Sequence, residues 1–333
     1  MEKLLTLTSL RRVVQLFAFV FFVYGALFFT TFYSDDKLTQ AFPSLTCAYD
    51  QQSGDYCVLI PLQHKVHHGV DRVIEGNIMQ TLIPLGITIG TFALLIIILN
   101  KAFCGWTCPL GFFQEMISIV GRKLGIKQLG TISKENIKKI RPIKWLIFAF
   151  LVLIFPLMAG LNIVGHEMGN PFCNICPSRI LTTLAVGDAS QLYVDNSNTT
   201  YLVLSLIADF LFGLMIALAL FVKQPFCRIC PILPMQTIFK KLGLFRLVKV
   251  DGSKCDSCNN CVKSCPMDIF EIQAKADGKQ NITYEDCTLC GKCVEFCPDN
   301  DVLRLEYAGI AVFKSSNDYF KKRNKFDKMV FKK

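Results

Sequence analysis

Long apolar runs alternate with polar, charged segments along this chain. Four runs reach the roughly 20 residues that a helix needs to cross the hydrocarbon core of a bilayer. They cover residues 13–32, 81–100, 143–164 and 201–222. We predict one transmembrane helix from each run, with a kink at Pro156 in the third, because proline interrupts helical hydrogen bonding. The first run is longer than the apolar part of a signal peptide and no small-residue cleavage site follows it, so we interpret it as an uncleaved anchor.

The Lys and Arg residues indicate how these helices are oriented. Of the 36, 32 lie before the first run, between residues 101 and 144, or from residue 223 onward; four lie in the loops 34–80 and 165–200. Basic residues stay on the cytoplasmic side, so we expect a multi-pass protein of the cytoplasmic (inner) membrane with both termini in the cytoplasm. The net charge of +10 is then an orientation signal. We expect no nucleic-acid partner, because no nucleic-acid-binding motif accompanies the charge.

The composition narrows the class of protein further. With 52% hydrophobic and 19% charged residues, the chain is neither disordered nor an ordinary soluble enzyme. It also carries 16 cysteines, yet it is too long and too apolar for a small disulfide-stapled secreted domain. Metal ligation, disulfides or both must therefore account for the cysteines.

The C-terminal part of the chain carries one cysteine motif twice. Cys-x2-Cys-x2-Cys-x3-Cys-Pro begins at Cys255 and again at Cys287, with the spacing of bacterial ferredoxins. Three thiolates on a tight loop can bind three irons of one [4Fe–4S] cubane, and the fourth cysteine starts a helix and reaches the other cluster. The expected ligand sets are Cys255, Cys258, Cys261 and Cys297 for one cluster, and Cys287, Cys290, Cys293 and Cys265 for the other. Zinc and a disulfide scaffold are the alternatives, but zinc motifs rarely repeat four cysteines at this spacing and the cytoplasm disfavours disulfides.

Two further cysteine pairs follow the second and fourth apolar runs. They read Cys104-Gly-Trp-Thr-Cys108-Pro109 and Cys227-Arg-Ile-Cys230-Pro231, and each has a glutamine six residues after its second cysteine (Gln114 and Gln236). Both pairs lie at the predicted cytoplasmic ends of their spans, so we expect these four thiolates to hold a third cubane. The proline suits the first turn of a helix, whose N-terminus would direct backbone N–H groups at the anionic cluster. The alternative is buried, inert thiols beside a helix start.

Four cysteines remain, and they lie on the opposite side in the predicted topology. Cys173 and Cys176 follow the third run, and Cys47 and Cys57 lie in the 34–80 loop. Together they could hold a fourth, outer-face cluster, which would use all 16 thiols in four sets of four. A Cys47–Cys57 disulfide is the alternative in an oxidising compartment. It would leave the other two as a second disulfide or as ligands of another group.

The histidines and one acidic residue are candidates for proton or quinone chemistry. His64, His67 and His68 share one face if their segment is helical, and His166 precedes the third cysteine pair. They could bind quinol and take its protons, because imidazole titrates near neutral pH, or ligate a haem or metal. We favour a solvated interfacial helix without a ligand. Asp209 lies inside the fourth run, where an acid is costly, so it is a candidate for proton transfer or for pairing with a neighbouring subunit.

Taken together, these motifs resemble the membrane polyferredoxins of the NapH/NosR-like type, the 4Fe–4S quinol dehydrogenase membrane component family. The resemblance rests on the two Cys-Pro segments after the second and fourth runs and on the C-terminal ferredoxin motif, and it covers roughly residues 80–300. It implies electron transfer between the quinone pool and a partner redox protein. The Cys173/Cys176 and Cys47/Cys57 pairs look additional to the family pattern.

The sequence thus predicts an α-helical membrane bundle with a C-terminal α+β ferredoxin-like domain. We expect a transmembrane domain over 1–245, a 2[4Fe–4S] domain over 246–307 and a basic tail over 308–333. A bilayer core is about 30 Å thick. Clusters at its two faces would therefore need a close approach inside the bundle, a re-entrant cysteine segment or a partner's cofactor between them.

We predict an electron-transfer subunit of a respiratory redox complex that relays electrons between cytoplasmic-side clusters, membrane clusters, and quinone or a partner. Cytochrome or iron–sulfur subunits and the quinone pool are the expected partners. The rival hypotheses are an assembly or maturation factor for a metalloenzyme and a redox-sensing regulator. No DNA-binding motif supports the regulator.

Overall fold

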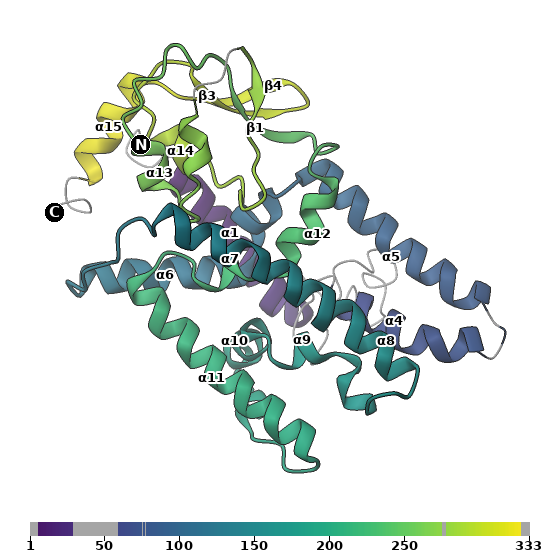
Figure 1. Ribbon diagram of the computed structural model, residues 1–333. Helices are drawn as coiled ribbons and strands as arrows, with labels where there is room; N and C mark the ends of the chain where they lie inside the picture. Colours follow the sequence, from purple (N-terminus) through teal and green to yellow (C-terminus); the bar gives the residue numbers. More distant parts are fainter. Residues whose placement is uncertain (1–5, 29–58, 75, 77, 275–277, 328–333) are drawn as a thin grey trace.

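Within the part of the chain that the structure describes, four helices are long and apolar enough to cross a membrane. The computed structural model describes residues 6–28, 59–74, 76, 78–274 and 278–327. The four helices are α1 (Leu7–Phe28), α5 (Ile78–Leu99), the continuous helix built from α7 (Lys134–Ile147), η4 (Phe148–Ile154) and α8 (Phe155–Gly160), and α11 (Thr199–Phe221). Figure 1 shows them beneath a sheet-containing unit at one end of the bundle. The predicted fold class, a four-helix membrane bundle with a C-terminal ferredoxin-like unit, is confirmed.

The first and third of these helices begin earlier than their apolar runs predict. Helix α1 begins at Leu7, and the third begins at Lys134. In both helices, charged residues near the N-terminal end form ion pairs with other parts of the protein. Arg11 pairs with Glu115, and Arg141 bonds Glu271 and Asp286 of the ferredoxin-like unit. Hydropathy alone cannot detect such turns, because their ion pairs come from distant segments.

Pro156 lies inside the third helix without ending it. The preceding turns, η4, are π-helical, and the chain continues as α8 to Gly160. A π turn changes the hydrogen-bond register, which accommodates the N–H that proline lacks. The expected irregularity is therefore present as a wide turn just before the proline.

Two segments join consecutive spans at the end of the bundle away from the ferredoxin-like unit, and in each of them a helix folds back into the bundle. Helix α4 (Leu59–Ile74) packs against α5 and α8, and α10 (Pro177–Val186) packs against α1, α6 (Pro109–Lys123) and α11. The shorter elements η5 (His166–Gly169), α9 (Pro171–Asn174) and η6 (Ser190–Leu192) connect this region. Leu59 and Phe172 are buried in one core with Phe226. Leu59 and Phe172 lie in re-entrant elements, which a span-by-span analysis of hydropathy assigns to loops.

The ferredoxin-like unit rests on the other end of the bundle, where η3 (Phe103–Thr107), η7 (Phe226–Arg228) and α12 (Ile232–Phe239) lie. Its antiparallel sheet has the order β2-β1-β3-β4. The strands are β1 (Phe245–Lys249), β2 (Gln280–Asn281), β3 (Leu303–Tyr307) and β4 (Ile310–Lys314). The helical elements are α13 (Asn260–Ser264), η8 (Phe270–Gln273), α14 (Lys292–Glu295) and α15 (Asn317–Asp327). The first part of the segment expected to be a tail thus adds β4 to the sheet.

Candidate metal centres

The two ferredoxin-type cysteine loops have the same backbone path. The second residue after the first cysteine has positive φ in both, 53° at Ser257 and 51° at Leu289. The fourth residue does as well, 68° at Asn259 and 76° at Gly291. Left-handed conformations are uncommon outside glycine, so their repetition at equivalent positions marks a shared loop design. Each loop wraps tightly and presents its cysteines to one side.

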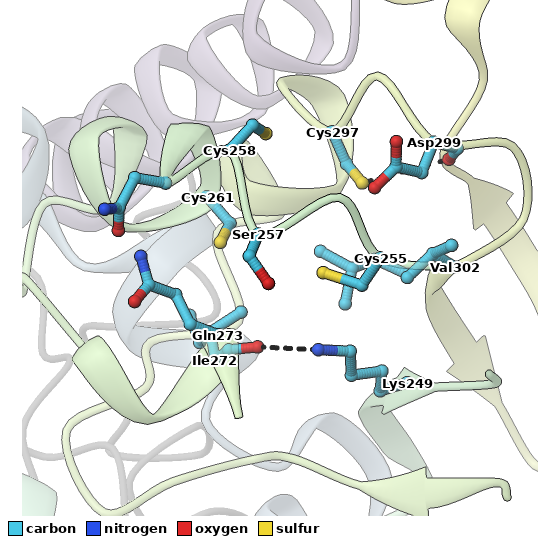
Figure 2. A pocket seen from close by; sticks show the side chains of 12 residues that line it. Lys249, Cys255, Ser257, Cys258, Cys261, Ile272, Gln273, Cys297, Asp299 and Val302 are labelled. Atoms are coloured by element: carbon cyan, nitrogen blue, oxygen red, sulfur yellow. Dashed lines mark hydrogen bonds between the residues drawn. The ribbon is translucent and has the colours of Figure 1, made fainter. Parts of the chain in front are cut away.

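Each loop borders a cavity that the other loop completes. The first cavity is lined by one set of four cysteines: Cys255, Cys258, Cys261 and Cys297. Figure 2 shows these cysteines around it, with Lys249 on another wall, its Nζ bonded to the Ile272 carbonyl. The second cavity is lined by the other set: Cys265, Cys287, Cys290 and Cys293. We call them the distal site and the proximal site. The structure thus groups the eight thiols as the motif predicts, with each fourth cysteine exchanged.

The donor chemistry of these sites fits an iron–sulfur cluster. Burial raises the pKa of Cys261 to about 12 and that of Cys265 to about 11. The metal-free thiols are therefore protonated at neutral pH, and metal ligation must release those protons. Backbone N–H groups already point at the sulfurs; the Leu289 N–H, for example, donates to Cys287 Sγ over 3.4 Å. Such donors stabilise the thiolate that ligation requires.

The two pairs after the second and fourth spans also meet. Cys104 interacts electrostatically with Cys108 and Cys227, and Cys230 with Cys104 and Cys227. We call this group the bundle site. Cys108 is the N-cap of α6, and Pro109 is its first residue, as expected. At the other pair, α12 begins one residue after Pro231, which is itself the cap.

Glutamines complete the bundle site. The Gln114 amide donates to Cys227 Sγ over 3.5 Å, and the Cys104 thiol donates to Gln236 Oε1 over 3.2 Å. The matching position of the two glutamines in the sequence thus corresponds to a matching contact across the site. Gln236 Nε2 is buried and has no hydrogen-bond partner among the described residues. That orphaned donor fits a site designed for an unprotonated sulfur.

Cys173 and Cys176 do not lie at the opposite end of the bundle, and this corrects the outer-face prediction. Cys176 interacts electrostatically with Cys230 of the bundle site, and both residues pack against the same core. The physical reason is that α9 and α10, which follow the third span in the chain, fold back into the bundle. Like Cys108, Cys176 is the N-cap of a helix that begins with proline. Cys47 and Cys57 lie outside the described residues.

The proximal site is docked directly on the bundle site. Gly105, between the cysteines of the first membrane motif, lies so close to the Thr288–Cys290 backbone that no side chain would fit there. The Trp106 indole N–H donates to the Leu289 carbonyl over 3.0 Å. In the distal site, by contrast, Cys258 is exposed.

Two basic residues that the sequence did not single out hold this contact together. Arg228, inside the second membrane motif, pairs with Asp268 at 2.7 Å and donates to the Pro266 carbonyl at 2.8 Å, beside Cys265. Lys101 is fully buried between the domains and bonds Thr237 Oγ1 and the Tyr284 carbonyl. Burial lowers the pKa of Lys101 to about 8. A charged residue inside or just before a cysteine motif at a membrane face is the sequence signal that could have identified both.

The four histidines gather around the outer part of α4. The His64 and His68 ring centroids lie 4.4 Å apart with the rings tilted by 44°, and His67 Nε2 lies 3.2 Å from His166 Nδ1. His67 is buried rather than solvated, so the favoured interpretation of a wet interfacial helix does not hold for it. Within the described ranges, no three His, Cys, Asp or Glu side chains converge closely enough for a single metal ion.

Asp209 lies midway along α11, as predicted. Its Oδ1 is buried and has no hydrogen-bond partner in the part of the chain that the structure describes. The next residue, Phe210, is largely exposed on the outer surface of the bundle. A carboxyl group in this setting retains an unmet need for a proton or a polar partner.

These features define a membrane protein of ferredoxin type whose cysteines are arranged for [4Fe–4S] clusters. The 4Fe-4S dicluster domain family matches residues 247–298, and the 4Fe-4S binding domain family matches residues 81–127 and again 205–249. The second family therefore recognises both membrane motifs with their spans, and the first recognises the C-terminal loops. No solved structure matches the chain.

Curated relatives give the family. An uncharacterized protein of Methanocaldococcus jannaschii is 30% identical over 71% of this chain and 83% of its own length. The ferredoxin-type protein NapH of Haemophilus influenzae is 29% identical over 60% of each chain. The regulatory protein NosR of Pseudomonas aeruginosa is 27% identical over 66% of this chain but only 27% of NosR. The chain belongs to the NapH/NosR-type membrane polyferredoxins, and it is an iron–sulfur protein with an electron-transfer role. It spans less than two thirds of NapH and of NosR.

Proposed function

We propose that the chain is an electron-transfer subunit of a respiratory redox complex in the cytoplasmic membrane. It would relay electrons between the ferredoxin-like unit in the cytoplasm, the bundle site, and quinone or a membrane or extracytoplasmic partner. The contact between the proximal and bundle sites carries this proposal. A [4Fe–4S] cluster supplies one-electron transfer when bound, and the chain's contribution is to hold the sites in line and close together.

The exposure of each site and the residues that cover it indicate the order of the sites along the electron path. The distal site has the exposed Cys258 at its edge, so a soluble redox partner can approach there. The proximal site is covered by Gly105 and Trp106 on one side and by Arg228 on another. It is therefore shielded from soluble partners and would exchange electrons with the distal and bundle sites. Distal, proximal and bundle sites then form a single path, with Cys104, Cys108, Cys227 and Cys230 as ligands at its membrane end.

A fourth site, held by Cys47, Cys57, Cys173 and Cys176, is part of the proposal. Gln63 Nε2 donates to Cys173 Sγ over 3.1 Å, as Gln114 does to Cys227. Gln63 also stands six residues after Cys57, the spacing that separates Gln114 from Cys108. Because Cys176 interacts electrostatically with Cys230, the re-entrant segment shortens the step that a bilayer-wide gap would have prevented.

The histidine group suits the outer end of this path. Gly169, on the loop that leads to Cys173, packs against the His67 ring, and a methyl group there would lie 3.0 Å from His67 Nδ1. The His67–His166 pair is therefore close to the cysteine segment and can exchange protons, as quinol oxidation or quinone reduction requires. His64, His68 and Asp209 are the further groups we assign to proton handling.

Metal analysis of the anaerobically purified full-length protein tests the proposal. We expect about 16 iron atoms and 16 sulfides per chain with four filled sites, and about 12 with three. Cys227→Ser should abolish one membrane-cluster EPR signal and leave the ferredoxin-like signals unchanged. Cys261→Ser should abolish one ferredoxin-like signal and leave the membrane-cluster signals unchanged. Folded protein with about eight irons and no effect of Cys227→Ser would overturn the membrane part of the proposal. Co-purification of stoichiometric haem or iron–sulfur subunits would support the redox complex, and substoichiometric binding to an immature metalloenzyme would overturn it.

A further inference from the structure

Three buried glutamines end on cysteine sulfurs in the membrane part of the molecule. Gln114 contacts Cys227 and Gln236 contacts Cys104. Gln63, on a different helix and beside a different cysteine pair, contacts Cys173. None of the three glutamine side chains is accessible to solvent. Burying a polar amide is costly unless it is hydrogen-bonded, so each is placed there for its contact.

The contacts follow one rule. Gln114 stands six residues after the second cysteine of its own motif and reaches the first cysteine of the opposite motif. Gln236 likewise stands six residues after the second cysteine of its own motif and contacts Cys104, the first cysteine of the other motif. The bundle site thus consists of two half-sites, and the glutamine of each half-site forms a hydrogen bond with the first cysteine of the other.

The third glutamine repeats the local geometry of the first. Gln114 Nε2 donates both to the Leu110 carbonyl, one helical turn before it, and to sulfur. Gln63 Nε2 donates to the Leu59 carbonyl at the same distance of 3.2 Å, and to Cys173. The bond to the preceding turn fixes the amide, so its second N–H is directed at the sulfur before any ligand arrives.

Gln236 differs in a way that the protonation state of the sulfur explains. As a thiol, Cys104 donates its proton to Gln236 Oε1, which leaves Nε2 without a partner. A ligating sulfur has no proton to give. Rotating the amide by 180° then places Nε2 on the sulfur; the two orientations have nearly the same shape. In that orientation the orphaned donor has the Cys104 sulfur as its acceptor.

We propose that Gln63, Gln114 and Gln236 are positioning residues that donate hydrogen bonds to cluster-ligating sulfurs and so raise the reduction potentials of the membrane clusters. The inference rests on the proposed function and deepens it. Hydrogen bonds to ligand sulfurs stabilise the more negative, reduced state of a cluster. Removing a donor should therefore make that cluster, and no other, harder to reduce.

Redox titration of the full-length protein, followed by EPR, tests this. Gln114→Met and Gln236→Met keep the side-chain length and remove the donor. At fixed ambient potential, each should lower the reduced-to-oxidised ratio of the bundle-site cluster about tenfold, a shift of about 59 mV for a one-electron couple. Gln63→Met should shift a different membrane signal. Gln128→Met is the matched control, because the Gln128 amide donates to the Ser118 carbonyl rather than to sulfur; it should shift none.

The outcomes separate the two proposals. Membrane clusters present with unchanged potentials in all three variants would overturn the role of the glutamines and leave the relay intact. Absence of membrane-cluster signals from the unaltered protein would overturn the proposed function itself. If Gln114→Met loses its cluster, Gln114→Leu is titrated instead, because it also removes the donor and is smaller. It should lower the potential of the bundle-site cluster, and an unchanged potential would refute the inference.

Discussion

Replacing Gly105 by alanine should loosen the ferredoxin-like unit from the bundle. A β-carbon at this position would overlap the Thr288 carbonyl oxygen and lie 3.1 Å from the Cys290 nitrogen. Both neighbours are backbone atoms of a buried loop, so neither can rotate away. Restoring an ordinary C···O contact of about 3.3 Å requires the two backbones to separate by roughly 1 Å. The Trp106–Leu289 bond spans the same contact and would be strained with it.

Overpacking of this kind costs about 1–3 kcal/mol. A cost of about 2 kcal/mol corresponds to a roughly 30-fold shift in the docking equilibrium. Hydrogen–deuterium exchange of residues 103–107 and 287–291, compared at equal iron content, measures that shift directly. Gly213→Ala is the matched control, because a β-carbon there meets nothing within 4 Å. Equal exchange in Gly105→Ala, Gly213→Ala and the unaltered protein would refute the close contact from which the electron path is argued.

Three further changes probe the same interface and the thiols. Arg228→Met leaves the buried carboxylate of Asp268 without its ion-pair partner and should cost about 3–5 kcal/mol of stability. The cost is measured as a loss of thermal stability, which the double variant Arg228→Met/Asp268→Asn should partly restore. An unshifted unfolding transition would contradict the ion pair. Lys101→Met leaves buried carbonyls without a donor and should cost about 1–3 kcal/mol by chemical denaturation, whereas Lys101→Arg should retain more of the stability. Metal-free protein should lose stability as pH rises from 9 toward 12, because the folded state holds the Cys261 proton to about 12 while the unfolded state releases it near 9.0. Denaturant titrations at pH 7 and 10 check this, and equal midpoints would show that the thiol is not buried.

Hydropathy and cysteine spacing predicted much of the architecture. Apolar runs of membrane-spanning length identify helices from length alone, and the ends of α5 and α11 fall within three residues of the predicted ones. The doubled motif likewise predicted which cysteines share a cavity, because the loop that it encodes is local. The glutamine spacing was visible as well, but its meaning required the two half-sites to be seen facing one another.

What only the tertiary structure decided is how the segments approach each other. The sequence assigned Cys173 to the outer face, since hydropathy counts spans but does not detect a short helix that turns back between them. It treated Arg11 as a topological signal, whereas the structure buries it against Glu115 and the Gly105 carbonyl. The sequence determines local conformation and the thiol inventory through short-range spacing. The proximity of the cysteine sites depends on packing between residues far apart in the chain, and the pattern of one segment contains no information about its distant neighbour.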